Sequence, residues 1–228
     1  LTAGSALAEK IIIGHFGNPT PMQLLSTSTE LAEATGWEIE WRKFDAGTDV
    51  IAAMASGDVV LSELGSSPVA IGASSGLEIE LIAYSDVIGQ AESLIAREGS
   101  GIASVADLKG KRIATFKGSS AHANLLLQLT KAGLSRADVE TVFVSPADGY
   151  TSLTKGDVDA WATWDPYTAI AENESGARAI ATAGFAKDVE GIESMFAVQR
   201  VGRAGEASEE EILENDGDPG FKRHVQRI

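Results

Sequence analysis

The chain has 228 residues, of which 44% are hydrophobic, and this length supports one large or two small globular domains. Its formal net charge of −15 argues against binding to nucleic acid or to an anionic membrane surface, because both repel an acidic protein. The sequence contains no cysteine, which excludes disulfides and Cys-based zinc sites. No apolar run approaches the roughly 20 residues of a membrane span.

The first residues resemble the end of a secretory signal. Ala6-Leu7-Ala8 fits the small-x-small pattern of a cleavage site, so we expect residues 1–8 to be a signal-peptide remnant and maturation to occur near Glu9. An Ala-rich terminus without that role is the alternative. Export without a cysteine for lipid attachment predicts a soluble periplasmic protein with no lipid anchor.

The first part of the chain alternates strands and helices. Strands are predicted at Lys10–Gly14, Trp37–Trp41, Val59–Leu61 and Leu77–Asp86, and helices at Met22–Thr35, Asp49–Ser56 and Val69–Ala73. This order indicates a parallel sheet covered by helices. Ligands of such sheets bind at the loops beyond the carboxyl ends of the strands, so we expect a site there.

A second α/β pattern follows with a strand at Ser93–Arg97. Further strands are predicted at Arg112–Thr115, Val139–Val144 and Ala160–Trp164, and helices at Ser104–Gly110, from the loop Lys117–His122 to Lys131, at Ala147–Leu153, and after Pro166. The pattern therefore predicts a second unit of the same class as the first.

Each unit contains a glycine and two serines between a strand and a helix. In the first unit the motif is Gly65-Ser66-Ser67-Pro68, and in the second it is Gly118-Ser119-Ser120. The N-terminus of a helix presents unpaired N–H groups and the positive end of its dipole, and hydroxyls add further donors. Two such motifs favour an anion site, although each alone is also typical of an ordinary capped helix.

The chain resembles the substrate-binding proteins of taurine, aliphatic sulfonate and nitrate ABC transporters. The resemblance covers roughly Lys10 to Arg200 and is carried by Trp41–Gly47, Leu64–Pro68, Ala91–Leu94, Asp107–Ala114 and Lys155–Ala160. The motif Asp-Leu-Lys-Gly-Lys at residues 107–111 is general to the wider fold group, whereas the first two segments are most similar to the taurine branch.

The resemblance implies a type 2 periplasmic binding fold, in which two α/β lobes joined by a hinge close on a ligand. We expect lobe 1 to comprise residues 9–88 and 199–228, and lobe 2 residues 89–198. Residues 201–228 do not match the family pattern, so the C-terminal part is interpreted as shortened or diverged. An N-cap with acidic residues at Ser208–Leu213 is compatible with a helix or with a solvated charge run.

The resemblance implies that a sulfonate is bound by hydroxyls and helix N–H groups. These would come from Ser66 and Ser67 in lobe 1 and from Ser119 and Ser120 in lobe 2. Simple capping is the alternative role of the second pair. The ammonium group of taurine would need an acid, and the candidates are Glu92, Asp45 and Asp165. The resemblance to the taurine branch favours Glu92. Asp45 and Asp165 are also plausible helix caps.

Other residues are candidates for covering the ligand. Trp164 could lie over it or make a cation–π contact, or could belong to the core. Phe16 and Asn18 lie in the first loop and could close the pocket. His122 follows the second motif, where packing or capping is the alternative to ligand contact. The three histidines are scattered, so no metal site is expected.

The sequence therefore predicts a monomeric receptor for taurine or a related small sulfonate, with an ABC permease as partner and no cofactor. Nitrate, an alkanesulfonate or a thiamine precursor are alternative ligands, and a ligand-gated sensor domain is an alternative role. Catalysis is not expected, since no Gly-x-Ser-x-Gly motif and no Ser-His-acid spacing is present, and the Cys-rich iron motif of the related pyrimidine synthases is missing.

Overall fold

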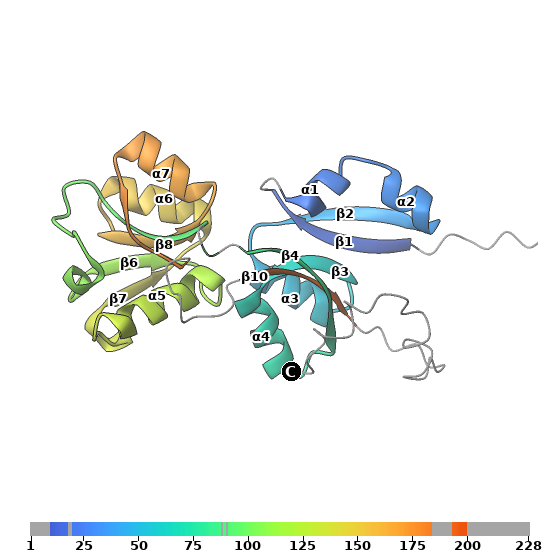
Figure 1. Ribbon diagram of the computed structural model, residues 1–228, viewed down its shortest axis with the longest axis horizontal. Coiled ribbons are helices and arrows are strands. Elements are labelled where there is room, and N and C mark those ends of the chain that lie inside the picture. The colour runs from blue at the N-terminus through green and yellow to red at the C-terminus, as the bar shows by residue number, and fades with distance from the viewer. Residues whose placement is uncertain (1–9, 18–19, 88, 90, 184–192, 200–228) are drawn as a thin grey trace, which may run out of the picture.

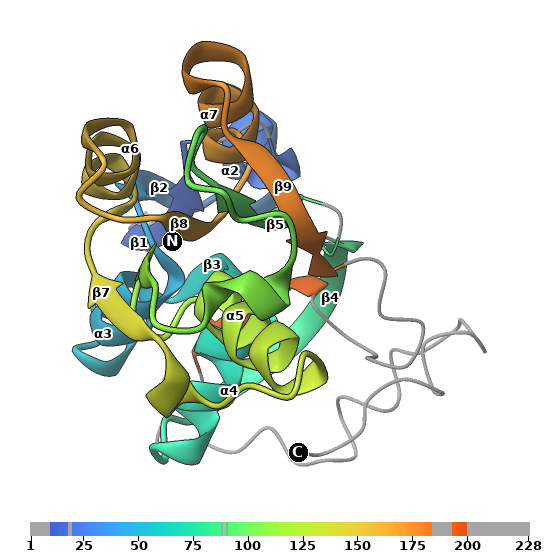
Figure 2. The same ribbon diagram turned by 90° about the vertical axis from the view of Figure 1, so that its left-hand side faces the viewer.

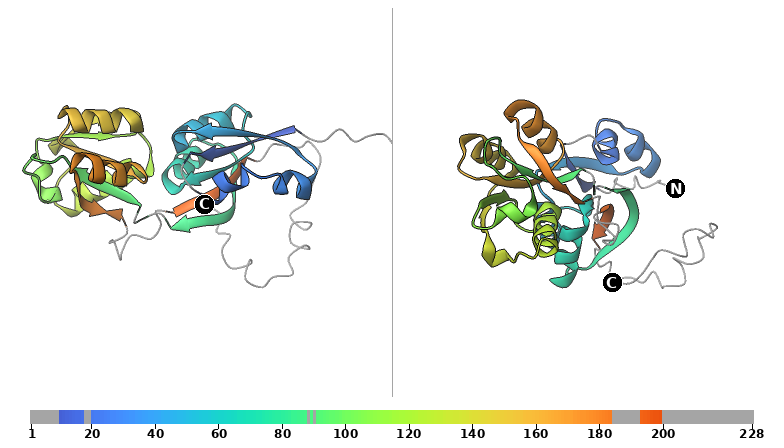
Figure 3. Two further views of the ribbon diagram at one scale, coloured as in Figure 1. Left: turned by 90° about the horizontal axis from the view of Figure 1, so that it is seen from above. Right: turned by 60° about the vertical axis from the view of Figure 1, so that its left-hand side comes forward.

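The computed structural model describes residues 10–17, 20–87, 89, 91–183 and 193–199. They form two α/β lobes that lie side by side, and the lobes remain distinct when the molecule is seen from above (Figures 1 and 3). The expected signal remnant, the helix at Ser208–Leu213, the other tail residues and Asn18 lie outside the described residues. The two-lobed α/β fold expected from the sequence is confirmed.

The first lobe has a five-stranded sheet of order β2-β1-β3-β10-β4. Its strands are β1 (Lys10–Phe16), β2 (Glu38–Phe44), β3 (Leu61–Gly65), β4 (Ile79–Val87) and β10 (Glu193–Gln199). Its helices are α1 (Pro21–Leu25), α2 (Glu30–Thr35), α3 (Gly47–Ala55) and α4 (Ser66–Ser74). β1 runs parallel to β2 and β3, whereas β10 runs antiparallel to β3 and β4.

The second lobe repeats this plan with the order β7-β6-β8-β5-β9. Its strands are β5 (Glu92–Ala96), β6 (Arg112–Thr115), β7 (Glu140–Phe143), β8 (Ala160–Trp164) and β9 (Arg178–Thr182). Its helices are α5 (Ser120–Lys131), α6 (Pro146–Lys155) and α7 (Tyr167–Ser175), with short 3-10 turns at η1 (Val105–Leu108) and η2 (Arg136–Asp138). β6 is parallel to β7 and β8, and β5 is antiparallel to β8 and β9.

Side chains of the central strands of the second sheet point alternately to its two faces, and a hydrophobic core lies on each face. Leu94 and Ala162 point to the face covered by α5, while Ile95 and Trp161 point to the face covered by α6 and α7. Figure 2 shows these helices on opposite sides of the sheet. Helix α6 can pack closely on β8 because Gly149 has no side chain. A Cβ at this position would lie 2.5 Å from Nε1 of the buried Trp161.

The chain crosses between lobes after β4 and again after β9, and this second crossing corrects the expected boundary. We expected residues 89–198 to form lobe 2, but β10 pairs with β3 and β4 in the first sheet, with Met195 opposite Leu64. The chain is therefore back in lobe 1 by Glu193. The strand β9 was not predicted, because it is short and half exposed.

Two local predictions in lobe 1 were also wrong. The expected helix Met22–Thr35 is broken into α1 and α2, because the hydroxyls of Ser26, Thr27 and Ser28 bond to carbonyls of the preceding turn and compete with helix continuation. The expected strand Val59–Leu61 is displaced, and β3 extends through residues 62–65 to the start of α4.

Candidate ligand-binding site

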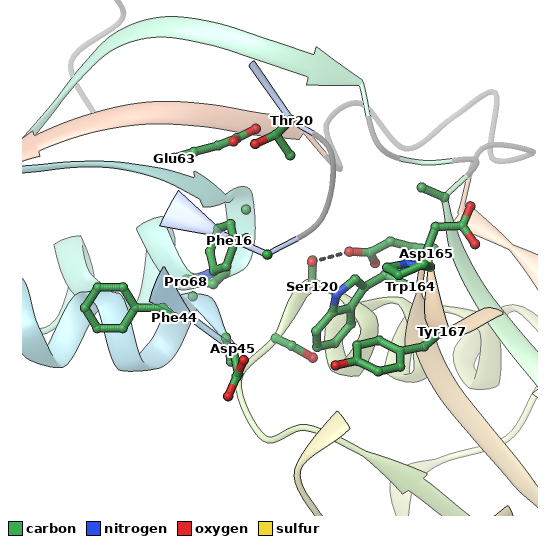
Figure 4. Close-up of a pocket in the computed structure, with 18 of the residues that line it drawn as sticks. Phe16, Thr20, Phe44, Asp45, Glu63, Pro68, Ser120, Trp164, Asp165 and Tyr167 are labelled. Carbon is green, nitrogen blue, oxygen red and sulfur yellow. Dashed lines mark hydrogen bonds between the residues drawn. The ribbon is translucent and has the colours of Figure 1, made fainter. Parts of the chain in front are cut away.

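A pocket of about 450 Å³ lies between the lobes, within the size range typical of small-molecule sites (Figure 4). Its walls are the carboxyl ends of β1, β2, β3 and β8, the start of β5, and the first turns of several helices. The lining residues from lobe 1 are Phe16, Gly17, Thr20, Pro21, Lys43, Phe44, Asp45, Ala46, Gly47, Glu63, Gly65 and Pro68, and those from lobe 2 are Ala91, Glu92, Ser119, Ser120, Trp164, Asp165, Pro166 and Tyr167.

Three helix N-termini meet at this pocket, and glycines allow them to approach. A Cβ at Gly47, the first residue of α3, would lie 2.6 Å from Cγ of Pro68 in α4. A Cβ at Gly65, which caps α4, would lie 3.2 Å from Oγ of Ser120 in α5 of the other lobe. The starts of α3, α4 and α5 therefore lie against one another across the gap between the lobes.

The N-termini of α3 and α4 have no side-chain cap among the residues that the structure describes. The residues preceding these helices are Ala46 and Gly65, and neither has a side chain that can cap a helix. The first backbone N–H groups of a helix have no intrahelical acceptor, so those of the first turns are available to an external one. Pro68 contributes none, which leaves Ser66 and Ser67 as the N–H donors of α4.

The serine hydroxyls of lobe 2 are already engaged. Ser119 caps α5: its Oγ accepts a hydrogen bond from the backbone N–H of His122 at 3.1 Å and donates to the carbonyl of Phe116 at 2.8 Å. Ser120 Oγ donates to Oε1 of Glu92, the bond drawn as a dashed line in Figure 4. An anion at α5 would therefore meet backbone N–H groups first, and would compete with Glu92 for the Ser120 hydroxyl.

Glu92 is the buried acid of lobe 2 in this pocket. It is 1% exposed, and burial raises its pKa to about 7, although the hydrogen bond from Ser120 opposes that shift. Its second oxygen, Oε2, has no hydrogen-bond partner among the described residues. A buried carboxylate of this kind is stabilised by a proton or by a cationic ligand group.

Glu63 is a second buried acid, and the sequence analysis missed it. It lies in β3, is 2% exposed and lines the pocket from lobe 1. Ser85 Oγ in β4 donates a hydrogen bond to its Oε1 at 2.8 Å. An acidic residue between Leu61 and Leu64 was the signal that could have identified it, but the predicted strand ended at Leu61 and left Glu63 outside it.

The other acids lie at the rim. Asp45 is exposed and forms an ion pair with Lys43, with 3.7 Å between Nζ and Oδ1. Across the gap lies Tyr167, whose pKa is raised by burial and then by the charge of Asp45. Asp165 accepts a hydrogen bond at 3.3 Å from the N–H of Ala169 in the first turn of α7, whose N-cap is Pro166. Both aspartates are exposed to water, which screens their charges, whereas Glu92 is buried.

Aromatic rings form the apolar walls. Phe16 and Phe44 lie on the lobe 1 side, and Trp164 and Tyr167 on the lobe 2 side (Figure 4). The rings of Trp164 and Tyr167 meet edge to face, with centroids 6.2 Å apart. These surfaces can enclose an aliphatic part of a ligand.

Six of the ten predicted site residues line the pocket: Asp45, Glu92, Ser119, Ser120, Trp164 and Asp165. Ser66 and Ser67, the first two residues of α4, do not line it, although Gly65 and Pro68 on either side of them do. Asn18 is outside the described residues.

His122, the tenth, also lies away from the pocket. Its Nδ1 accepts a hydrogen bond from the N–H of Gly118 at 3.3 Å, and its ring packs edge to face on Phe143. Burial, then the charges of Arg136 and Lys117, lower its pKa. The ring therefore has the packing contact that the sequence left open as its alternative role, and His122 is not among the residues that line the pocket.

Two further observations concern the described part of the chain. None of its helices combines the length and the apolar character that crossing a bilayer requires. Its His, Asp and Glu side chains nowhere gather in threes as metal ligands would.

Known proteins of similar sequence include the taurine-binding periplasmic protein of Escherichia coli (strain K12), which is 33% identical over 164 residues, covering 72% of this chain and 51% of that protein. The chain spans about half the length of the curated relatives it matches.

Two solved structures are similar at 31% identity and cover 85% of this chain. The alkanesulfonate-binding protein SsuA from Xanthomonas axonopodis pv. citri, bound to MOPS, has a TM-score of 0.78 over 67% of its length. The periplasmic aliphatic sulphonate binding protein SsuA from Escherichia coli has a TM-score of 0.73 over 66% of its length. The family described as NMT1/THI5 like matches residues 33–190, which is more than half of the chain. The chain therefore belongs to the NMT1/THI5-like family.

Proposed function

We propose that this chain is the ligand-binding part of a periplasmic receptor that encloses a small aliphatic sulfonate between its lobes and delivers it to an ABC permease. The observation that carries the proposal is the meeting of the α3, α4 and α5 N-termini from both lobes at one pocket. The names of the similar proteins, which are receptors for sulfonates or taurine, support the same ligand class.

A sulfonate suits these donors because it is tetrahedral, weakly basic and only an acceptor. With a net charge of −15, the protein as a whole repels an anion, so the attraction must be local. A helix N-terminus contributes about 0.3–1 kcal/mol, and up to about 2 when partly buried. Micromolar affinity corresponds to about 8 kcal/mol. Helix dipoles alone fall short of this, so two or three charge-assisted hydrogen bonds of about 1.5–3 kcal/mol each must supply the rest.

Taurine is the specific ligand we propose, with its ammonium group at Glu92. The Oε2 of Glu92, which has no hydrogen-bond partner in the described part of the chain, offers an acceptor, and a buried ion pair with the ligand would stabilise the charged carboxylate. Nitrate or a thiamine precursor would match this pocket less well, since nitrate brings no donor for the buried acids and a cationic precursor brings no anion for the helix N-termini. The pocket binds its ligand unchanged, without a catalytic step.

A thermal-shift panel tests the proposal. The 228-residue chain is heated alone and with taurine, ethanesulfonate, nitrate, bicarbonate and a thiamine precursor. A ligand present at 100 times its Kd should add about 2.7 kcal/mol to the free energy of unfolding. We expect stabilisation by at least one sulfonate. The absence of a shift with every sulfonate, or a shift with nitrate alone, would contradict the proposal.

A further inference from the structure

Glu63 holds a carboxylate in the pocket wall of lobe 1. Its side chain is 2% exposed, and the hydrogen bond from Ser85 fixes its Oε1 from the neighbouring strand β4. In Figure 4 it lies on the same side of the pocket as Thr20, away from Trp164 and Tyr167. A hydrogen-bonded, buried side chain in this position has a defined orientation toward whatever enters the pocket.

The short separation of Glu63 from the N-terminus of α4 limits the length of a ligand that can reach both. Glu63 and Gly65 are two residues apart in β3, so their Cα atoms are separated by about 7 Å at a strand rise of about 3.3 Å per residue. Residues so spaced point to the same face of a strand. An anion at the start of α4 would therefore have a carboxylate a short aliphatic chain away along the same strand.

Each lobe thus places one buried carboxylate in the pocket, Glu63 from β3 and Glu92 from β5. Charges in such a poorly solvated space interact more strongly than in water. The pocket consequently contains groups of both signs: helix N-termini attract one anion, and the two carboxylates beside them, Glu92 next to Ser120 and Glu63 two residues before Gly65, disfavour a second anion.

We propose that Glu63 is a specificity-determining residue that rejects sulfonates carrying a second negative charge and favours those whose far end donates hydrogen bonds. This inference rests on the proposed sulfonate site. It assigns to lobe 1 a selective role at the end of the ligand opposite the sulfonate, in addition to the role of Glu92 in lobe 2.

Titration calorimetry with three sulfonates of equal chain length tests the assignment. Ethanesulfonate ends in a methyl group, isethionate in a hydroxyl and sulfoacetate in a carboxylate. The wild-type chain should bind sulfoacetate at least about tenfold more weakly than ethanesulfonate, because like charges brought together in a site are costly. In Glu63→Gln, the affinity for sulfoacetate should rise by about tenfold, while that for ethanesulfonate should stay within about threefold.

The Gln side chain has nearly the shape of Glu and keeps an oxygen for the Ser85 hydroxyl, so the variant should fold, and its melting temperature checks this. Glu38→Gln is the matched control, since Glu38 is exposed in the same lobe and does not line the pocket. It should leave all three affinities unchanged.

Two results would overturn the assignment: equal binding of sulfoacetate and ethanesulfonate by the wild-type chain, or an unchanged ratio of these affinities in Glu63→Gln. The wild-type ratio requires no variant, so equal binding of the two ligands by the wild-type chain would overturn the assignment even if Glu63→Gln does not fold. A wild-type chain that binds none of the three sulfonates would instead refute the proposed function.

Discussion

Replacement of Glu92 by Gln should change how the stability of the ligand-free protein depends on pH. Glu92 is 1% exposed, and burial raises its pKa from 4.5 to about 7. Between these two values the folded protein binds a proton at this position that the unfolded chain does not. The wild-type free energy of unfolding therefore falls as pH rises through this window.

The magnitude follows from the shift of the pKa. The stabilisation linked to Glu92 is fully present below about pH 4.5 and is lost once pH exceeds about 7. A shift of about 2.5 units, each worth about 1.36 kcal/mol, corresponds to about 3 kcal/mol. The Gln variant cannot titrate, so its stability relative to wild type should rise by about this amount from pH 4.5 to pH 8.

Urea denaturation followed by tryptophan fluorescence measures the difference at each pH. Groups other than Glu92 titrate in both proteins and cancel in the subtraction. Glu98→Gln is a control, because Glu98 is an exposed glutamate in the same lobe. A difference between wild type and Glu92→Gln that stays constant from pH 4.5 to pH 8 would refute the reasoning, since Glu92 would then have an ordinary pKa in the folded protein.

Three further predictions concern ligand affinity and local structure. Taurine affinity should rise about tenfold from pH 6 to pH 8, because its ammonium group requires Glu92 to be ionised, whereas ethanesulfonate affinity should not rise. Calorimetry at both pH values measures the two affinities. An equal change of both affinities with pH would contradict the pairing of the ammonium group with Glu92. Ser119→Ala should lower the free energy of unfolding by about 1 kcal/mol because it removes the cap of α5, whereas Ser66→Ala removes no cap and should lower it less. Urea denaturation measures both changes, and equal decreases would be inconsistent with the capping geometry. Gly149→Ala should lower stability although alanine has the better helix propensity. Overpacking against Trp161 costs about 1–3 kcal/mol, which outweighs a propensity gain of about 1 kcal/mol. A stabilised variant would exclude the close approach of α6 to Trp161.

Most of the fold could be predicted from patterns along the chain. The strands β6 and β8 were predicted with the residues that they have, because turn residues flank short, largely apolar segments that form the centre of a sheet. The second crossing between lobes could not be predicted in the same way. The strand β10 belongs to lobe 1 only through its long-range pairing with β3 and β4, and a local pattern carries no information about such pairing.

Part of the pocket lining was predicted from the sequence, but the hydrogen bonds of its serine hydroxyls were not. The motif around Gly65 and the choice of Glu92 followed from sequence spacing and resemblance, and both residues line the pocket. The sequence could not show that the hydroxyls of Ser119 and Ser120 donate hydrogen bonds to Phe116 and Glu92, because these bonds depend on how the elements pack. The predicted strand also ended before Glu63, since the end of a buried strand is hard to locate when an acidic residue interrupts its apolar run.

A crystal structure of the protein with bound taurine would show directly where the ligand lies. We predict that the sulfonate oxygens lie within hydrogen-bond distance of backbone N–H groups in the first turns of α3, α4 and α5, with both lobes contacting the ligand. We further predict that the amino group of taurine lies at Glu92. A sulfonate bound elsewhere, for example at Lys43 on the rim with the three helix N-termini unoccupied, would contradict the proposed site.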